Sequence, residues 1–155
     1  MQKLLSFLRC KPVFFFWLTL AYIVFLYAVK WNIHPTLQAG LFAIGSVIGM
    51  YFLEGAERFF QLDPSPFRSI VFVGLFTLVS FFVLTSSVSY IASGLVLAIF
   101  LTLILWQSGE WVTVKNLNRW YTMLADPVKP RLQLGILLLQ VAFFIVQTII
   151  FLKRA

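Results

Sequence analysis

Residues 69–106 read SIVFVGLFTLVSFFVLTSSVSYIASGLVLAIFLTLILW, which is two long apolar stretches separated by a short polar link. The first stretch covers 69–88 and the second covers 90–106. A helix rises about 1.5 Å per residue, so about 20 mostly apolar residues cross the roughly 30 Å hydrocarbon core of a bilayer. Both stretches approach that length, and the link leaves room only for a tight turn. The segment therefore predicts a transmembrane hairpin of two antiparallel helices.

Three further stretches of the same kind, 13–29, 37–53 and 132–152, lie on either side of this hairpin. Hydrophobic residues make up 61% of the chain and charged residues 11%, and the mean hydropathy is +0.96. This composition leaves too little polar surface for a soluble domain. We therefore predict an all-α, polytopic transmembrane helical bundle with about five spanning helices, forming a single integral membrane domain over 1–155. A re-entrant hairpin over 69–106 is the alternative to two full spans.

Basic residues are divided unequally between the two sides of this predicted bundle. Nine lie on the N-terminal side, namely Lys3, Arg9, Lys11, Arg58, Arg68, Lys115, Arg119, Lys129 and Arg131, and three on the other, namely Lys30, Lys153 and Arg154. Since Lys and Arg concentrate in cytoplasmic loops, we expect a cytoplasmic N-terminus and a C-terminus on the far side. The chain shows no transit-like leader or retention signal, so we expect a prokaryotic inner membrane. The excess of basic residues then reflects topology, and no nucleic acid partner is expected.

The longest segment outside the apolar stretches carries a helical pattern of large side chains near 109–125. Apolar and aromatic residues recur there at steps of three and four, at Trp111, Val114, Leu117, Tyr121 and Leu124. Lys115 and Arg119 fall on other faces, and Trp120 adds a further aromatic ring. This pattern is typical of an amphipathic helix in the headgroup layer, so we predict a lipid-contacting helix on the cytoplasmic face. Residues 1–8 show a shorter pattern of the same kind.

Small residues at helical spacing predict where the spans pack closely. Gly45 and Gly49 form a GxxxG pair in 37–53, and Gly94 and Ala98 are four residues apart in 90–106. Because lipid tails are as apolar as leucine, membrane helices associate through close backbone approach at such positions. We therefore expect the second, third and fourth stretches to form the packed centre of the bundle.

Three glutamines lie seven residues apart in the last stretch, at Gln133, Gln140 and Gln147. Seven residues return to nearly the same direction on a helix, so the three amides share one stripe. An amide facing lipid would lose its hydrogen bonds, so this stripe should face protein or water. Two interpretations stay open: hydrogen bonds between helices, or a polar path for a solute in which Gln140 and Gln147 bind it.

Four charged residues gather around the end of the second stretch and the turn after it: Glu54, Glu57, Arg58 and Arg68. A salt-bridge cluster that holds the turn at headgroup level is one interpretation. The other is a binding site, facing the cytoplasm, for a cation, a proton or a basic group of a partner. Two carboxylates three residues apart, without a histidine nearby, are not a specific metal motif.

No catalytic motif appears in the sequence, and the single cysteine, Cys10, excludes a disulfide within the chain and a cysteine-based metal cluster. We therefore expect no cofactor and no metal. The leading hypothesis is a non-enzymatic accessory component that binds membrane lipids, another membrane protein or a further copy of itself. A small oligomeric transporter or channel and an enzyme acting on lipid are the two alternatives.

Overall fold

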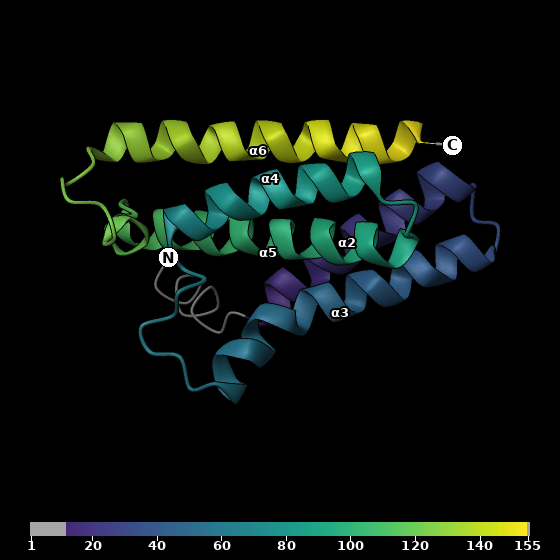
Figure 1. Ribbon diagram of the computed structural model, residues 1–155, viewed down its shortest axis with the longest axis horizontal. Helices are drawn as coiled ribbons and strands as arrows, with labels where there is room; N and C mark the ends of the chain where they lie inside the picture. Colours follow the sequence, from purple (N-terminus) through teal and green to yellow (C-terminus); the bar gives the residue numbers. More distant parts are fainter. Residues whose placement is uncertain (1–11, 155) are drawn as a thin grey trace.

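A computed structural model describes residues 12–154 as five α-helices and one short 3-10 helix. In chain order the α-helices are α2 (Pro12–Trp31), α3 (Leu37–Phe59), α4 (Ile70–Ser86), α5 (Tyr90–Val114) and α6 (Pro130–Lys153), and the 3-10 helix is η1 (Asn118–Tyr121). The α-helices lie side by side and alternate in direction, so that the start of α2 and the end of α6 are at opposite ends (Figure 1). The predicted all-α bundle is confirmed, and the described residues contain no strand.

The helices begin where a side chain or a proline satisfies the first turn. The hydroxyl groups of Thr36, Ser69 and Ser89 accept hydrogen bonds from backbone amides three residues later, which caps α3, α4 and α5. Pro130 occupies the first turn of α6, where a missing N–H group costs least. These local signals lie in polar segments between apolar stretches, so the boundaries follow from the sequence.

The hairpin predicted for 69–106 is present as α4 and α5, with Ser87–Ser89 as the connection. Four helices, α2, α3, α5 and α6, are long and apolar enough to cross a membrane. The fifth, α4, is equally apolar but has 17 residues, which corresponds to about 25 Å of helix. The protein is therefore a helical membrane bundle with four helices long enough to span a bilayer. The expectation that the third stretch belongs to the packed centre is wrong, because only Val73, Ser80 and Leu84 of α4 are buried and a Cβ atom on Gly74 would meet no heavy atom within 4 Å.

Helix α5 is the central element. Its side chains are buried almost continuously from Ser93 to Gln107, and it packs against α2, α3, α4 and α6. Aromatic side chains fill the space around it; for example, Phe100 contacts Phe76 of α4 and Phe144 of α6. An apolar helix that is buried on all sides must be surrounded by other helices.

The closest helix contact joins α3 to α5 through three glycines. A Cβ atom placed on Gly45 would lie 2.1 Å from the carbonyl oxygen of Ile91, and one on Gly94 would lie 2.3 Å from that of Phe42. A Cβ atom on Gly49 would lie 2.5 Å from the carbonyl oxygen of Leu95 and 3.0 Å from the Cβ of Ala98. The two backbones therefore touch at positions where only glycine fits.

The helix predicted near 109–125 differs from the structure. Helix α5 continues to Val114 and ends at Lys115, whose φ of 62° is left-handed, and only the four residues of η1 follow as helix. Leu117, Trp120 and Tyr121 are buried in the protein instead of lying in the headgroup layer. A turn divides the predicted pattern of large side chains, and the bundle covers Leu117 and Tyr121 of its apolar face, whereas Val114 and Leu124 are exposed. The expectation for 1–8 concerns residues outside the described part of the chain.

Candidate functional site

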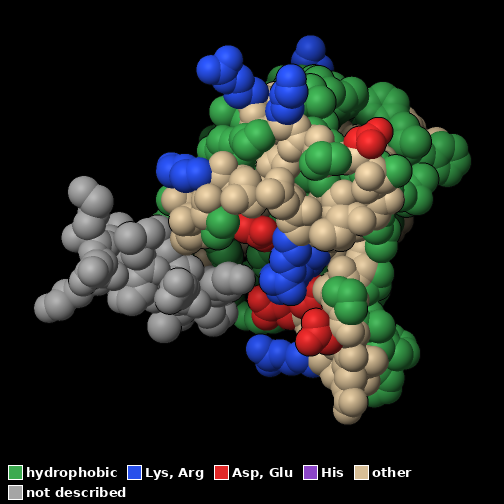
Figure 2. Space-filling view, turned by 90° about the vertical axis from the view of Figure 1, so that its left-hand side faces the viewer, with side chains coloured by type: hydrophobic (Ala, Val, Ile, Leu, Met, Phe, Trp, Pro, Cys, Tyr) green, Lys and Arg blue, Asp and Glu red, His purple; other side chains and the backbone are tan. Residues whose placement is uncertain are grey.

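The charged side chains gather at one end of the bundle, which is formed by the start of α2, the α3–α4 connection and the α5–α6 connection, together with the helix ends that these connections join. We call this the charged end. All five acidic residues of the chain and six basic residues lie in the segments that form it: Glu54, Glu57, Asp63, Glu110, Asp126, Arg58, Arg68, Lys115, Arg119, Lys129 and Arg131. Figure 2 looks onto this face and shows acidic and basic side chains next to each other across it.

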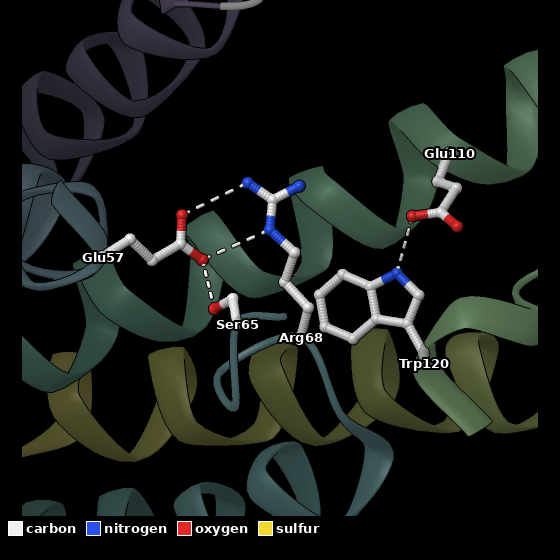
Figure 3. A network of polar contacts seen from close by, with 5 residues as sticks. All are labelled: Glu57, Ser65, Arg68, Glu110 and Trp120. Atoms are coloured by element: carbon white, nitrogen blue, oxygen red, sulfur yellow. Dashed lines mark hydrogen bonds and ion pairs between the residues drawn. The ribbon is translucent and has the colours of Figure 1, made fainter. Parts of the chain in front are cut away.

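Glu57 and Arg68 form an ion pair that ties the end of α3 to the connection before α4 (Figure 3). Arg68 donates from Nε to Glu57 Oε1 at 3.2 Å and from Nη2 to Oε2 at 3.3 Å. The Ser65 hydroxyl donates to the same carboxylate, and the guanidinium lies 4.6 Å from the ring centre of Trp106. This network has the geometry of the salt-bridge cluster considered above, because each charged group has a partner within the protein.

A second carboxylate at the charged end, Glu110, binds an indole. Trp120 donates from Nε1 to Glu110 Oε2 at 2.9 Å (Figure 3), and the Trp120 side chain is fully buried. Lys115 and Arg119, which lie between Glu110 and Trp120 in sequence, are exposed, and Trp111 is half-buried against the same apolar cluster. Trp120 therefore anchors the connection after α5 to the bundle.

Glu54 lies apart from this network, in a pocket between α2, α3 and α5 with a volume of about 410 Å³. Its other lining residues are Phe15, Phe16, Trp17, Thr19, Met50, Tyr51, Thr102, Leu105 and Trp106. The structure records no hydrogen bond or ion pair between Glu54 and another described residue, whereas Glu57 and Glu110 are both paired. The pocket thus combines a carboxylate with an apolar and strongly aromatic wall.

The four charged residues singled out in the sequence do not form one site. Glu57 and Arg68 are in contact, Glu54 lines the pocket, and Arg58 is exposed at the end of α3 without a recorded contact to either carboxylate among the described residues. Residues i and i+4 are neighbours on a helix, but Glu54 and Arg58 are not paired here. The aromatic residues of α2 were not recognised as site residues from the sequence, because their partners come from α3 and α5.

The three glutamines of α6 are buried, and each contacts a different part of the protein. Gln133 accepts a hydrogen bond from the Leu117 amide at 2.7 Å and so holds the connection after α5. Gln140 accepts from Gln107 Nε2 at 2.8 Å, and Gln147 accepts from the Ser80 hydroxyl at 3.1 Å. The amides therefore bond α6 to the rest of the bundle.

Two side chains of α2, Tyr22 and Lys30, make polar contacts with the C-terminal half of α6 that were not anticipated from the sequence. The Tyr22 hydroxyl shares a hydrogen bond with Thr148 at 2.8 Å. Lys30 Nζ donates to the carbonyl oxygens of Phe151 and Arg154 at 2.7 and 2.5 Å, at the C-terminal end of α6. A cation is favourable at a helix C-terminus. Because Lys30 belongs to α2, which is distant from α6 in sequence, the sequence gives no sign of this contact.

No group of three or more His, Cys, Asp or Glu side chains in residues 12–154 is arranged to hold a metal ion. Comparison with models of known protein families, with curated proteins and with solved structures found no match. Inference about function therefore depends on the geometry of this chain, above all on the pocket that contains Glu54.

Proposed function

We propose that the protein is a non-enzymatic component of the membrane that works by binding another membrane constituent, a lipid or a partner membrane protein. The observation that carries this proposal is the pocket between α2, α3 and α5. Its volume of about 410 Å³ falls within the range of ligand sites, which are mostly apolar with a few polar groups. The other carboxylates near it, Glu57 and Glu110, are engaged within the protein.

The two alternatives have less support. A solute path along α6 would need polar groups open to the solute, and the three buried glutamines each bond to protein groups instead. An enzyme acting on lipid headgroups would need reactive side chains that converge. Glu57 and Arg68 bind each other, and among the described residues Arg58 forms an ion pair with neither Glu54 nor Glu57.

We also propose that the charged end faces the cytoplasm. Of the nine basic residues that the structure describes, six lie in the segments at this end and three, Lys30, Lys153 and Arg154, lie at the other. This division follows the preference of Lys and Arg for cytoplasmic loops. A ligand in the pocket would then be drawn from the cytoplasmic leaflet or from a protein bound there.

Native mass spectrometry after extraction in a mild detergent tests the proposed function. We expect the wild-type protein to retain a lipid or a stoichiometric protein partner. Thr102→Phe fills the pocket with a large side chain and should abolish that retention. Thr85→Phe is the matched control, because Thr85 also bonds to a carbonyl four residues earlier in its helix and lies on the exposed side of α4. Retention of the same ligand by the Thr102→Phe variant would contradict the proposed function.

A further inference from the structure

Glu54 occupies a position where a carboxylate requires a positive partner. It lies little more than one turn before the end of α3, where the helix dipole is negative and disfavours an acidic side chain. It is half-buried in a pocket whose other walls are mostly apolar and aromatic. Removing a carboxylate from water without a cation is costly.

The described cations near the pocket do not supply that partner. Arg68 is held by both oxygens of Glu57 and lies over Trp106. Arg58, one turn after Glu54 on the same helix, is exposed and makes no recorded ion pair with Glu54. A positive charge that enters the pocket as part of a ligand would therefore complete the site.

The aromatic side chains around Glu54 suit a particular kind of cation. Phe16 packs against Trp17 with ring centres 5.7 Å apart and faces Tyr51 at 6.5 Å, and all three rings line the pocket. The faces of aromatic rings attract cations, and groups of such rings recognise alkylated ammonium ions. The guanidinium of Arg68, 4.6 Å from the ring centre of Trp106, shows such a contact at the pocket wall.

The apolar lining of the pocket and its opening toward the outer surface suit a ligand that carries an acyl chain as well as an ammonium group. Met50 and Leu105 provide apolar surface in the same pocket, which suits the first part of an acyl chain. Trp17 is 61% exposed and Tyr51 is 52% exposed, so the pocket opens between α2 and α3 onto the outer surface of the bundle. Figure 2 shows basic side chains on the charged end. Arg58, which is exposed one turn after Glu54 on α3, can pair with a phosphate group.

We propose that the pocket binds the ammonium headgroup of a zwitterionic phospholipid, of the ethanolamine or choline type, with Glu54 as its counter-ion. This inference rests on the proposed function and specifies the class of ligand. The Glu54 carboxylate pairs with the ammonium, and the rings of Phe16, Trp17 and Tyr51 surround it. A lipid whose headgroup is only anionic would place like charges together and is excluded from this pocket.

The test is lipid binding by native mass spectrometry, with phosphatidylethanolamine, phosphatidylcholine and phosphatidylglycerol that carry identical acyl chains. We expect the wild-type protein to prefer the first two lipids. Glu54→Gln should weaken their binding about tenfold, the scale of a hydrogen bond to a charged group, and should not weaken the binding of phosphatidylglycerol, because the substitution removes the like charge that repels this lipid. Asp126→Asn, which removes a carboxylate at the exposed surface of the same end, is the matched control and should change none of the three.

A competition experiment on the wild-type protein gives a second test that does not depend on the folding of a variant. Dodecyltrimethylammonium should displace bound phosphatidylethanolamine, whereas dodecyl maltoside, with the same chain and an uncharged headgroup, should not. Equal displacement by both would overturn the inference. Equal binding of all three lipids, unaffected by Glu54→Gln but abolished by Thr102→Phe, would overturn it and leave the proposed function intact.

Two further outcomes are decisive. If neither the wild-type protein nor the Thr102→Phe variant retained a lipid or a protein partner, both the proposed function and this inference would be overturned. If Glu54→Gln and Lys11→Gln lowered the stability of the lipid-free protein equally, and the double substitution cost no more than either, Glu54 would pair with a cation of its own chain. That result would also overturn the inference.

Discussion

Substitution of Gly45 by alanine should separate α3 from α5 and destabilise the protein. A Cβ atom at this position would lie 2.1 Å from the carbonyl oxygen, 2.8 Å from the carbonyl carbon and 2.9 Å from the Cα atom of Ile91. The oxygen would have to retreat by about 1.3 Å to reach ordinary van der Waals distance. All three atoms belong to backbone, so no side-chain rotation can relieve the contact.

The size of this effect follows from two opposing terms. Forcing extra volume into a packed contact costs about 1–3 kcal/mol, and the rigid backbone at Gly45 places the cost in the upper part of that range. Alanine is the better helix former by about 0.5–1 kcal/mol, which offsets part of it. We therefore expect Gly45→Ala to lower the free energy of unfolding by about 2 kcal/mol.

Gly55→Ala provides a matched control on the same helix. A Cβ atom on Gly55 would meet no heavy atom within 4 Å, so only the helix-forming preference remains. This variant should be more stable than wild type by up to about 1 kcal/mol.

The assay is unfolding by sodium dodecyl sulfate in dodecyl maltoside micelles, followed by far-UV circular dichroism. The two variants carry the same chemical change in one helix, so their difference isolates the contact with α5. Equal shifts of the unfolding midpoint for Gly45→Ala and Gly55→Ala would refute the close approach of α3 and α5.

Three other predictions concern single contacts and topology. Gln140→Leu leaves the Gln107 amide without its acceptor and should lower the free energy of unfolding by about 1–2 kcal/mol. Replacing both Gln107 and Gln140 by leucine should recover part of that loss, and additive costs in a double-mutant cycle would argue against the hydrogen bond. Wild-type protein in liposomes should show no solute flux above empty controls. The Tyr121 hydroxyl is buried without a partner among the described residues, and burial raises the pKa of Tyr121 above its ordinary value of 10.0. Ionisation of this group therefore leaves the free energy of unfolding unchanged below pH 10.0 and lowers it as the pH rises through the raised pKa. Tyr121→Phe should accordingly equal or exceed wild-type stability at pH 8 and lose less of it in alkaline unfolding curves, and identical alkaline losses would count against the burial effect. In a protein without Cys10, single cysteines at Asn32 and Asn118 should react with impermeant reagents from opposite sides of the membrane, and labelling from one side would end the proposed threading.

The candidate site shows how far local sequence signals reach. Glu54 was recognised because a carboxylate next to an apolar stretch is rare, and a rare residue can be recognised from the sequence alone. Phe16, Trp17 and Tyr51 could not be recognised, because aromatic residues are frequent throughout this chain. Only the packing of α2 against α3 and α5 brings those rings around the carboxylate.

The apolar stretches and their polar boundaries determined by themselves that this chain forms a helical membrane bundle with a tight α4–α5 hairpin. The reason is that a bilayer requires each span to satisfy its own backbone hydrogen bonds, so length and hydropathy are sufficient. The tertiary structure decided which faces meet: Trp120 turns into the protein instead of the headgroup layer, Glu57 pairs with Arg68, and Glu54 does not pair with Arg58. Such contacts depend on how helices rotate and cross, and helices distant in sequence supply the partners.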